Sequence, residues 1–371
     1  TAYEIRNCDW SSDVCSSDLD TGIRLTIRLT TMNQAASRHA IAPAQVLRGK
    51  GVWHEAIQAI RALGLRPLLL GRSGATAQLR QGLRKDLDGA GFITQPVDLR
   101  WDCCEADLER LARLVGSGQS QSADLVIAVG GGKVLDAGKL LADRCELPCV
   151  TVPTSAATCA GWTALANIYS TQGAFQRDQP LKRCPELLVF DHELVGRAPA
   201  RTLASGIADA MAKWYEASVS SGGSEDGLVQ QAVQMARILR DQLLLDGEQA
   251  MADPGAAAWV RVAEASALSA GVIGGLGGPR CRTVAAHAVH NGLTQLQACH
   301  SSLHGEKVAF GILVQLRLEE LVGGNQLASQ ARRQLLPFFR SLGLPVTLQD
   351  LGLAGASLSD LQQVCEFACR N

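Results

Sequence analysis

Between residues 52 and 194, short apolar segments alternate with amphipathic ones, and this alternation constrains the fold more than any other feature of the chain. The apolar segments that we expect to be strands are 66–74, 92–99, 124–132, 147–154 and 185–194. The segments with helical spacing are 52–63, 75–91, 105–117 and 133–145. Buried strands separated by helices predict an α/β domain whose parallel sheet is covered by helices on both faces.

After Pro199 the strand signals end, and the segments 201–219, 225–251 and 255–274 all have helical spacing. We therefore expect an α/β domain over residues 32–198, followed by an all-helical C-terminal domain over residues 199–371. Residues 1–31 lack a lasting apolar period, and their SSDVCSSDL segment resembles a translated adapter sequence. We expect this leader to be non-native and Met32 to be the true start.

Charge and cysteine content restrict the classes of partner. The net charge of −1, with no basic stripe, argues against nucleic acid. No apolar run reaches the roughly 18 residues that a membrane-spanning helix needs. The cysteines include no CxxC pair, so a structural zinc site is not expected. Without a credible secretory signal, we expect reduced thiols in a cytoplasmic protein.

Three consecutive glycines, Gly130 to Gly132, lie between an apolar strand and a helix that begins near Lys133. Without Cβ atoms the backbone there can approach a diphosphate, and the helix N-terminus adds free N–H groups and partial positive charge. A tight turn alone explains such glycines equally well. Their place at the carboxyl end of a parallel strand favours a ligand.

Two neighbouring strand ends carry further candidates for cofactor binding. The hydroxyls of Thr154, Ser155, Thr158 and Thr163 follow the next strand and could bond a nucleotide, although composition alone is equally typical of an ordinary loop. Arg72, with Ser73, ends the strand at 66–74. An arginine at such a position accommodates a 2′-phosphate, which favours NADP, whereas a simple solvated arginine is the alternative.

Histidines gather in the helical half of the chain. His287 and His290 are three residues apart, hence on one helix face, and His304 begins another helical segment after a break near Ser301. Asp209 interrupts an apolar helix and needs a partner there, for which a divalent metal would serve. The spacing alone favours ordinary core or surface roles for these residues over metal binding, because histidine pairs at helical spacing are common and no HExxH motif is present.

Five motifs, taken in order, resemble the iron-containing alcohol dehydrogenase family in its glycerol dehydrogenase branch. They are GGGKVLDAGK (130–139), VPTSAATCAGWTALANIY (152–169), GIADAMAKWYEA (206–217), AAHAVHNGLT (285–294) and HGEKVAFG (304–311). Within that branch the ATCAGWT, DAMAKWYEA and GGLG segments are most similar to the hydroxycarboxylate dehydrogenases, which reduce 2-oxo acids with NADPH. The resemblance covers residues 40–350.

The resemblance implies a Rossmann-like N-terminal domain, a helical C-terminal domain and an active site in the cleft between them. The implied metal ligands are Asp209, His287 and His304. The implied cofactor contacts are Gly130, Gly131, Gly132, Lys133, Val134, Thr154, Thr163, Leu165 and Tyr169, in addition to Arg72. The cofactors would be NADP or NAD and a divalent ion, zinc or iron. We also expect a small-molecule substrate and a homo-oligomer.

The chain departs from the glycerol dehydrogenase pattern at three places. Cys159 replaces an aspartate near the substrate, which weakens a polyol assignment. Lys213 lies one helical turn after Asp209, where its ammonium could bind a substrate carboxylate or compete with a metal. The chain also ends at Asn371, sooner than the family's usual C-terminal helices, which suggests a truncation.

The leading hypothesis is reversible hydride transfer between NADP(H) and a small 2-oxo or 2-hydroxy acid, assisted by a metal. His290 is a candidate proton relay, with a supporting role beside the metal as the alternative, and Lys213 and Arg282 are candidates for binding the carboxylate. The alternatives are an NAD-dependent glycerol or polyol dehydrogenase and a cofactor-binding protein without turnover. A dehydroquinate-synthase-like lyase is a further alternative, but it would need a glutamate in place of Asp209.

Overall fold

The computed structural model describes residues 39–72, 74–115, 122–281 and 283–370. The leader, Met32, Ser73 and Arg282 therefore lie outside the described residues. The strands are β1 Gln45–Gly49, β2 Pro67–Gly71, β3 Gln95–Asp98, β4 Leu125–Gly130, β5 Cys149–Pro153, β6 Leu165–Tyr169, β7 Phe175–Pro180 and β8 Leu187–Asp191. The helices of the sheet region are α1 Trp53–Arg61, α2 Ala77–Gly89, α3 Glu105–Val115, α4 Gly132–Cys145 and α5 His192–Val195.

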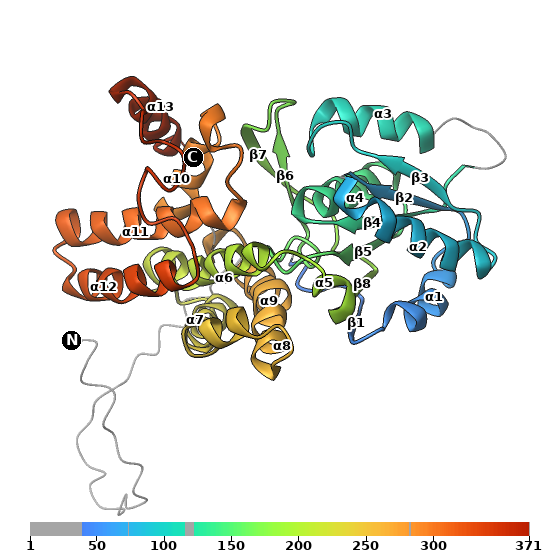
Figure 1. The fold of residues 1–371 in the computed structure, drawn as a ribbon, viewed down its shortest axis with the longest axis horizontal. Helices are drawn as coiled ribbons and strands as arrows, with labels where there is room; N and C mark the ends of the chain where they lie inside the picture. Colours follow the sequence, from blue (N-terminus) through green and yellow to red (C-terminus); the bar gives the residue numbers. More distant parts are fainter. Residues whose placement is uncertain (1–38, 73, 116–121, 282, 371) are drawn as a thin grey trace, which may run out of the picture. The chain divides into compact units, whose positions relative to one another are not determined.

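A six-stranded sheet in the order β1-β8-β5-β4-β2-β3 forms the first half of the described chain (Figure 1). Every neighbouring pair in it is parallel, which confirms the predicted fold class. Strand β1 was not predicted. Its residues are exposed or half-buried, so it lacks the apolar run that marks the central strands.

Successive residues of the central strands face opposite sides of the sheet, as the pleat requires. Leu68 and Val126 pack with α3 and α4 on one face, whereas Leu69 and Ile127 pack with α1 and α2 on the other. This two-sided burial explains why the strands are continuous apolar runs rather than alternating ones. Because all six strands are parallel, their carboxyl ends lie at the same edge of the sheet.

A two-stranded antiparallel hairpin, β6 with β7, was not predicted. The hairpin is held by two charged side chains of α4. Lys139 is buried, and its Nζ donates to the carbonyl oxygens of Thr163 at 2.9 Å and Leu165 at 2.5 Å. Asp136 accepts the Asn167 backbone N–H at 3.2 Å. An apolar period does not reveal a hairpin whose anchors are polar and distant in sequence.

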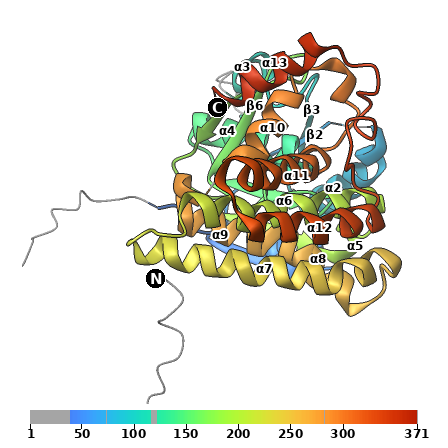
Figure 2. The ribbon, with the colours of Figure 1, turned by 90° about the vertical axis from the view of Figure 1, so that its left-hand side faces the viewer.

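Beyond Pro199 the described residues contain helices and turns but no strand. The helices are α6 Ala200–Ser220, α7 Gly227–Ala252, α8 Ala257–Glu264, α9 Ala270–Gly277, α10 Ala285–Leu293, α11 His304–Gly323, α12 Gln326–Ser341 and α13 Leu358–Ala368, with a π-helical turn at Ala265–Ser269. Figure 2 shows α6 packed between α7 and α11, and α6 is accordingly buried along most of its length. None of the described helices combines the length and apolarity needed to cross a bilayer. The boundary near residue 199 stays a prediction.

Candidate active site

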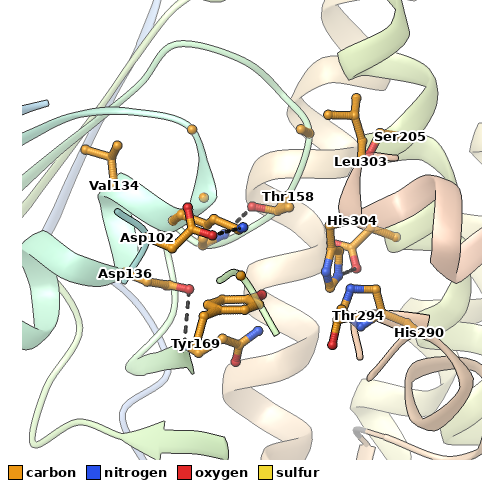
Figure 3. A pocket seen from close by; sticks show the side chains of 18 of the residues that line it. Asp102, Val134, Asp136, Thr158, Tyr169, Ser205, His290, Thr294, Leu303 and His304 are labelled. Carbon is orange, nitrogen blue, oxygen red and sulfur yellow. Dashed lines mark hydrogen bonds and ion pairs between the residues drawn. The ribbon is translucent and has the colours of Figure 1, made fainter. Parts of the chain in front are cut away.

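A cavity of about 780 Å³ lies where the carboxyl edge of the sheet meets the helices. Figure 3 shows both walls: Asp102 and Tyr169 come from the sheet side, and His290 and His304 come from the helical side. Of the predicted site residues, the cavity is lined by Arg72, Gly130, Gly131, Gly132, Lys133, Val134, Thr163, Leu165, Tyr169, Asp209, Lys213, His287, His290 and His304.

The turn of three glycines forms part of this wall. Gly131 is the N-cap of α4, and a glycine has no side chain that could cap the helix. The N–H groups of Gly132 and Lys133 at the start of α4 could therefore bind a ligand, and a helix N-terminus favours an anion. A Cβ atom on Gly130 would lie 2.7 Å from that of Val134, so glycine is required there for close packing of the turn.

Beside this turn, the buried carboxylate of Asp102 forms ion pairs with both Arg72 and Lys133. The ammonium of Lys133 also lies over the ring of Tyr169, 4.6 Å from its centroid. The carboxylate of Asp102 thus holds two cationic side chains beside the glycine turn. Asp102 was not predicted as a site residue. Its position just after a predicted strand, in the segment WDCCE, was the sequence feature that could have indicated it.

Thr154 does not line the cavity. It is buried at the end of β5, and its backbone N–H donates to the carbonyl oxygen of Gly130 at 3.0 Å. Its predicted contact with the cofactor stays a prediction.

On the helical side, side chains from three helices converge. His287 Nε2 from α10 lies 3.3 Å from Asp209 Oδ1 of α6, and His304 Nε2 from the first residue of α11 lies 3.1 Å from the same oxygen. One donor atom from each residue lies within 4.8 Å of the others. With metal–ligand bonds of about 2.0–2.1 Å, two ligands of a tetrahedral ion are roughly 3.3 Å apart. The two carboxylate–imidazole spacings fit that geometry.

In this cluster the carboxylates favour the protonated form of the imidazoles, and the imidazoles favour the ionised form of the carboxylates. Burial opposes ionisation of Asp209, yet His304 and His287 hold the pKa of its carboxyl well below the usual range. Burial likewise opposes protonation of His287, but the carboxylates of Glu216 and Asp209 raise its pKa to about 10. A divalent cation bound at Nε2 would therefore displace a proton from His287.

Glu216, on α6 seven residues after Asp209, was not predicted. Its carboxylate is buried and accepts from His287 Nδ1 at 2.5 Å and from the backbone N–H groups of Val284 and His287 at 2.9 and 2.8 Å. A glutamate within the DAMAKWYEA segment, on the same helix face as Asp209, was the signal that could have found it.

His290 is buried, and its ring centroid lies 4.2 Å from that of His304. Its Nδ1 is 2.9 Å from the side-chain oxygen of Asn291. Burial and the nearby positive charges of His304 and Lys307 hold the pKa of His290 well below its usual value. His290 lines the cavity, and its role as a proton relay stays a prediction.

Three further residues shape the part of the cavity next to the histidines. Lys213 and Cys159 line it, and burial raises the pKa of the Cys159 thiol. Lys307, which was not predicted, donates from Nζ to the carbonyl oxygens of Cys299 at 3.2 Å and Ser302 at 2.5 Å. Burial lowers the pKa of Lys307 to about 8. The candidate Arg282 lies outside the described residues.

Comparison with known proteins identifies several relatives of this chain. The model of the family described as iron-containing alcohol dehydrogenase matches residues 43–192. An uncharacterized oxidoreductase of Synechocystis sp. is 53% identical over 92% of this chain and 87% of its own length. Hydroxycarboxylate dehydrogenase A of Escherichia coli K12 is 36% identical over 81% of this chain and 80% of its own length.

Among solved structures, a probable glycerol dehydrogenase from Sinorhizobium meliloti 1021 shares the fold with a TM-score of 0.77. It is 30% identical, and the match covers 90% of this chain and 91% of that one. The parallel sheet and the helical region that follows it are therefore found together in a protein of similar length.

Proposed function

Since this chain belongs to the iron-containing alcohol dehydrogenase family, we propose that it transfers a hydride reversibly between NADP(H) and a small 2-oxo or 2-hydroxy acid. Family membership makes the chain an oxidoreductase and removes the support for the lyase hypothesis. The choice of acid substrate and of NADP is the proposal.

One observation supports the proposal above all others. The donor atoms of Asp209, His287 and His304 converge on the same cavity that the uncapped glycine turn and Lys133 line. The proposed diphosphate site and the proposed cation site would thus share a single cavity. That arrangement suits a dinucleotide and a small carbonyl compound bound side by side.

At the sheet end, the free N–H groups of α4 and the ammonium of Lys133 would bind the diphosphate. Arg72 would bind the 2′-phosphate, while Asp102 holds both cations in place. Thr163, Leu165 and Tyr169 would position the nicotinamide half along β6. A bound nicotinamide cofactor supplies or accepts the hydride.

At the helical end, Asp209, His287 and His304 would hold a divalent ion, which when bound polarises the carbonyl oxygen as a Lewis acid. Lys213, on the same helix as Asp209, would bind the carboxylate of the acid, and the candidate Arg282 would assist it. His290 would relay from solvent the proton that the reduced carbonyl oxygen requires: its Nδ1 faces the accepting oxygen of Asn291 and keeps its own proton, which leaves Nε2 to take up a proton and pass it on. Reduction of one 2-oxo acid thus consumes one NADPH and one proton.

Steady-state assays of 2-oxobutanoate and glycerol, each with NADP(H) and NAD(H), before and after chelation, test this function. We expect the highest kcat/KM for 2-oxobutanoate with NADPH, and loss of activity on chelation with recovery when zinc or iron is returned. Turnover of glycerol with NAD⁺ at a higher kcat/KM would favour the alternative, a polyol dehydrogenase. The similarity to the probable glycerol dehydrogenase supports that alternative.

Substituting Arg72 with alanine is expected to raise KM for NADPH by about 10- to 100-fold, because a charged hydrogen bond is worth about 1.5–3 kcal/mol. KM for NADH should change little. Arg84→Ala, which removes an exposed arginine paired with Asp88 on α2, is the matched control and should change neither value. Equal losses with both cofactors would contradict a role for Arg72 in binding the 2′-phosphate.

Substituting Lys213 with methionine is expected to raise KM for 2-oxobutanoate at least tenfold, since the carboxylate would lose a charged partner. KM for butanal, which lacks the carboxylate, should stay within threefold, about the effect of 0.6 kcal/mol. Lys50→Met, at an exposed lysine of the sheet region, should leave both substrates unchanged. A similar rise for the acid and the aldehyde would show that Lys213 does not recognise the carboxylate.

A further inference from the structure

We infer that Glu216 selects the nitrogen through which His287 binds the metal, and so acts as a positioning residue for the cation site. This inference rests on the metal site of the proposed function. It concerns a side chain that makes no contact with substrate or cofactor in that proposal, because Glu216 is not among the residues that line the cavity.

Glu216 is almost fully enclosed, with 1% of its side chain exposed. One oxygen, Oε1, accepts two backbone N–H groups at the start of α10, from Val284 at 2.9 Å and from His287 at 2.8 Å. The other oxygen, Oε2, lies 2.5 Å from His287 Nδ1. A glutamate of α6 thus satisfies the N-terminus of the neighbouring helix α10 and contacts the imidazole that this helix carries.

These contacts fix where the imidazole carries its proton. A carboxylate only accepts hydrogen bonds, so Nδ1 of His287 must be the donor in the contact with Glu216. When Nδ1 holds the proton of a neutral imidazole, the lone pair is on Nε2. Nε2 is the atom that lies 3.3 Å from Asp209 Oδ1, among the other donor atoms. Glu216 therefore presents the correct nitrogen to a cation.

The isosteric change Glu216→Gln reverses this preference. The single amide oxygen must stay on the two backbone N–H groups, since no other atom of glutamine can accept them. The amide NH₂ then faces Nδ1 of His287 as a donor. His287 would accept that bond at Nδ1 and keep its proton on Nε2, where the metal would need the lone pair.

The experiment measures zinc affinity of the full chain by competition with a chromogenic chelator, for the wild type and for Glu216→Gln. Removing such an outer partner typically costs 10- to 100-fold in metal affinity, and we expect a loss of that size. Glu264→Gln is the matched control, because Glu264 Oε1 contacts His192 Nε2 at 3.0 Å and lies outside the cavity. The control should bind zinc as the wild type does.

A second measurement determines directly which nitrogen of His287 binds the metal. In the zinc-loaded wild type, ¹⁵N NMR of labelled histidines should show His287 protonated at Nδ1 and bound to zinc through Nε2. The signals of His304, which contacts the same Asp209 oxygen from a different helix, should be unchanged in zinc-saturated Glu216→Gln. A role of Glu216 limited to capping α10 would lower the unfolding temperature of that variant without changing its zinc affinity.

Unchanged zinc affinity in a folded Glu216→Gln protein would overturn the inference, as would zinc bound through Nδ1 of His287 in the wild type. Failure of the wild type itself to bind zinc or iron would overturn the metal site of the proposed function, and this inference with it. The two failures are distinguishable because only in the second does the wild type fail to bind the metal.

Discussion

Replacing His287 with alanine is expected to lower kcat/KM for 2-oxobutanoate by about a thousandfold or more. A Lewis acid contributes several kcal/mol to the barrier of carbonyl reduction, and 1.36 kcal/mol corresponds to a factor of ten. Without this imidazole only Asp209 and His304 of the cluster remain. The measurement is the initial rate of NADPH consumption at saturating cofactor, together with the zinc content of the purified protein.

The control for this prediction is His54→Ala, because His54 is exposed on α1 in the sheet region. Circular dichroism of both variants should match the wild type. The buried carboxylate of Glu216 would lose its imidazole partner in His287→Ala, so some loss of thermal stability is expected. Full turnover by a folded His287→Ala protein would contradict the metal-assisted mechanism.

Replacing Gly305 with alanine is expected to destabilise the protein by about 1–3 kcal/mol and to weaken metal binding. Gly305 is the second residue of α11, next to His304, and a Cβ atom there would overlap the backbone carbonyl of Ser205 on α6. Since that obstacle is backbone rather than a flexible side chain, α11 would have to move away from α6. The shift would separate His304 from Asp209. Urea unfolding and zinc titration measure the two effects.

Gly323→Ala provides the matched comparison, because Gly323 lies at the other end of the same helix and has no heavy atom within 4 Å of its Cβ position. Alanine is about 1 kcal/mol more favourable than glycine within a helix, so this variant should be as stable as the wild type or more stable. If both variants behaved alike, close packing of α11 against α6 would not be what holds the site together.

The fold was predictable from the sequence because burial on both faces gives each central strand an unbroken apolar run. The strand predicted at 124–132 contains β4, and the helix predicted from Lys133 is α4. Strand β1 was missed because its exposed and half-buried residues form no apolar run, whereas β6 and β7 were missed for a different reason. Their positions depend on long-range contacts, such as Lys139 with the carbonyls of Thr163 and Leu165, which leave no local period.

At the candidate site, helical spacing placed His287 and His290 on one face, but it could not say which other helices would meet that face. The convergence of Asp209, His287 and His304 depends on how α6, α10 and α11 pack. The residues that support the site were missed for the same reason. Glu216 contacts His287 and Asp102 pairs with Arg72, and in each pair the two residues are far apart in the sequence.

Anomalous X-ray scattering from crystals grown with zinc, recorded at the zinc edge, tests the central claim most directly. We predict one strong peak about 2.0–2.2 Å from Asp209 Oδ1, His287 Nε2 and His304 Nε2, in the cavity that the glycine turn lines. A catalytically active crystal form with no peak at these three residues, or with its only peak elsewhere, would contradict it.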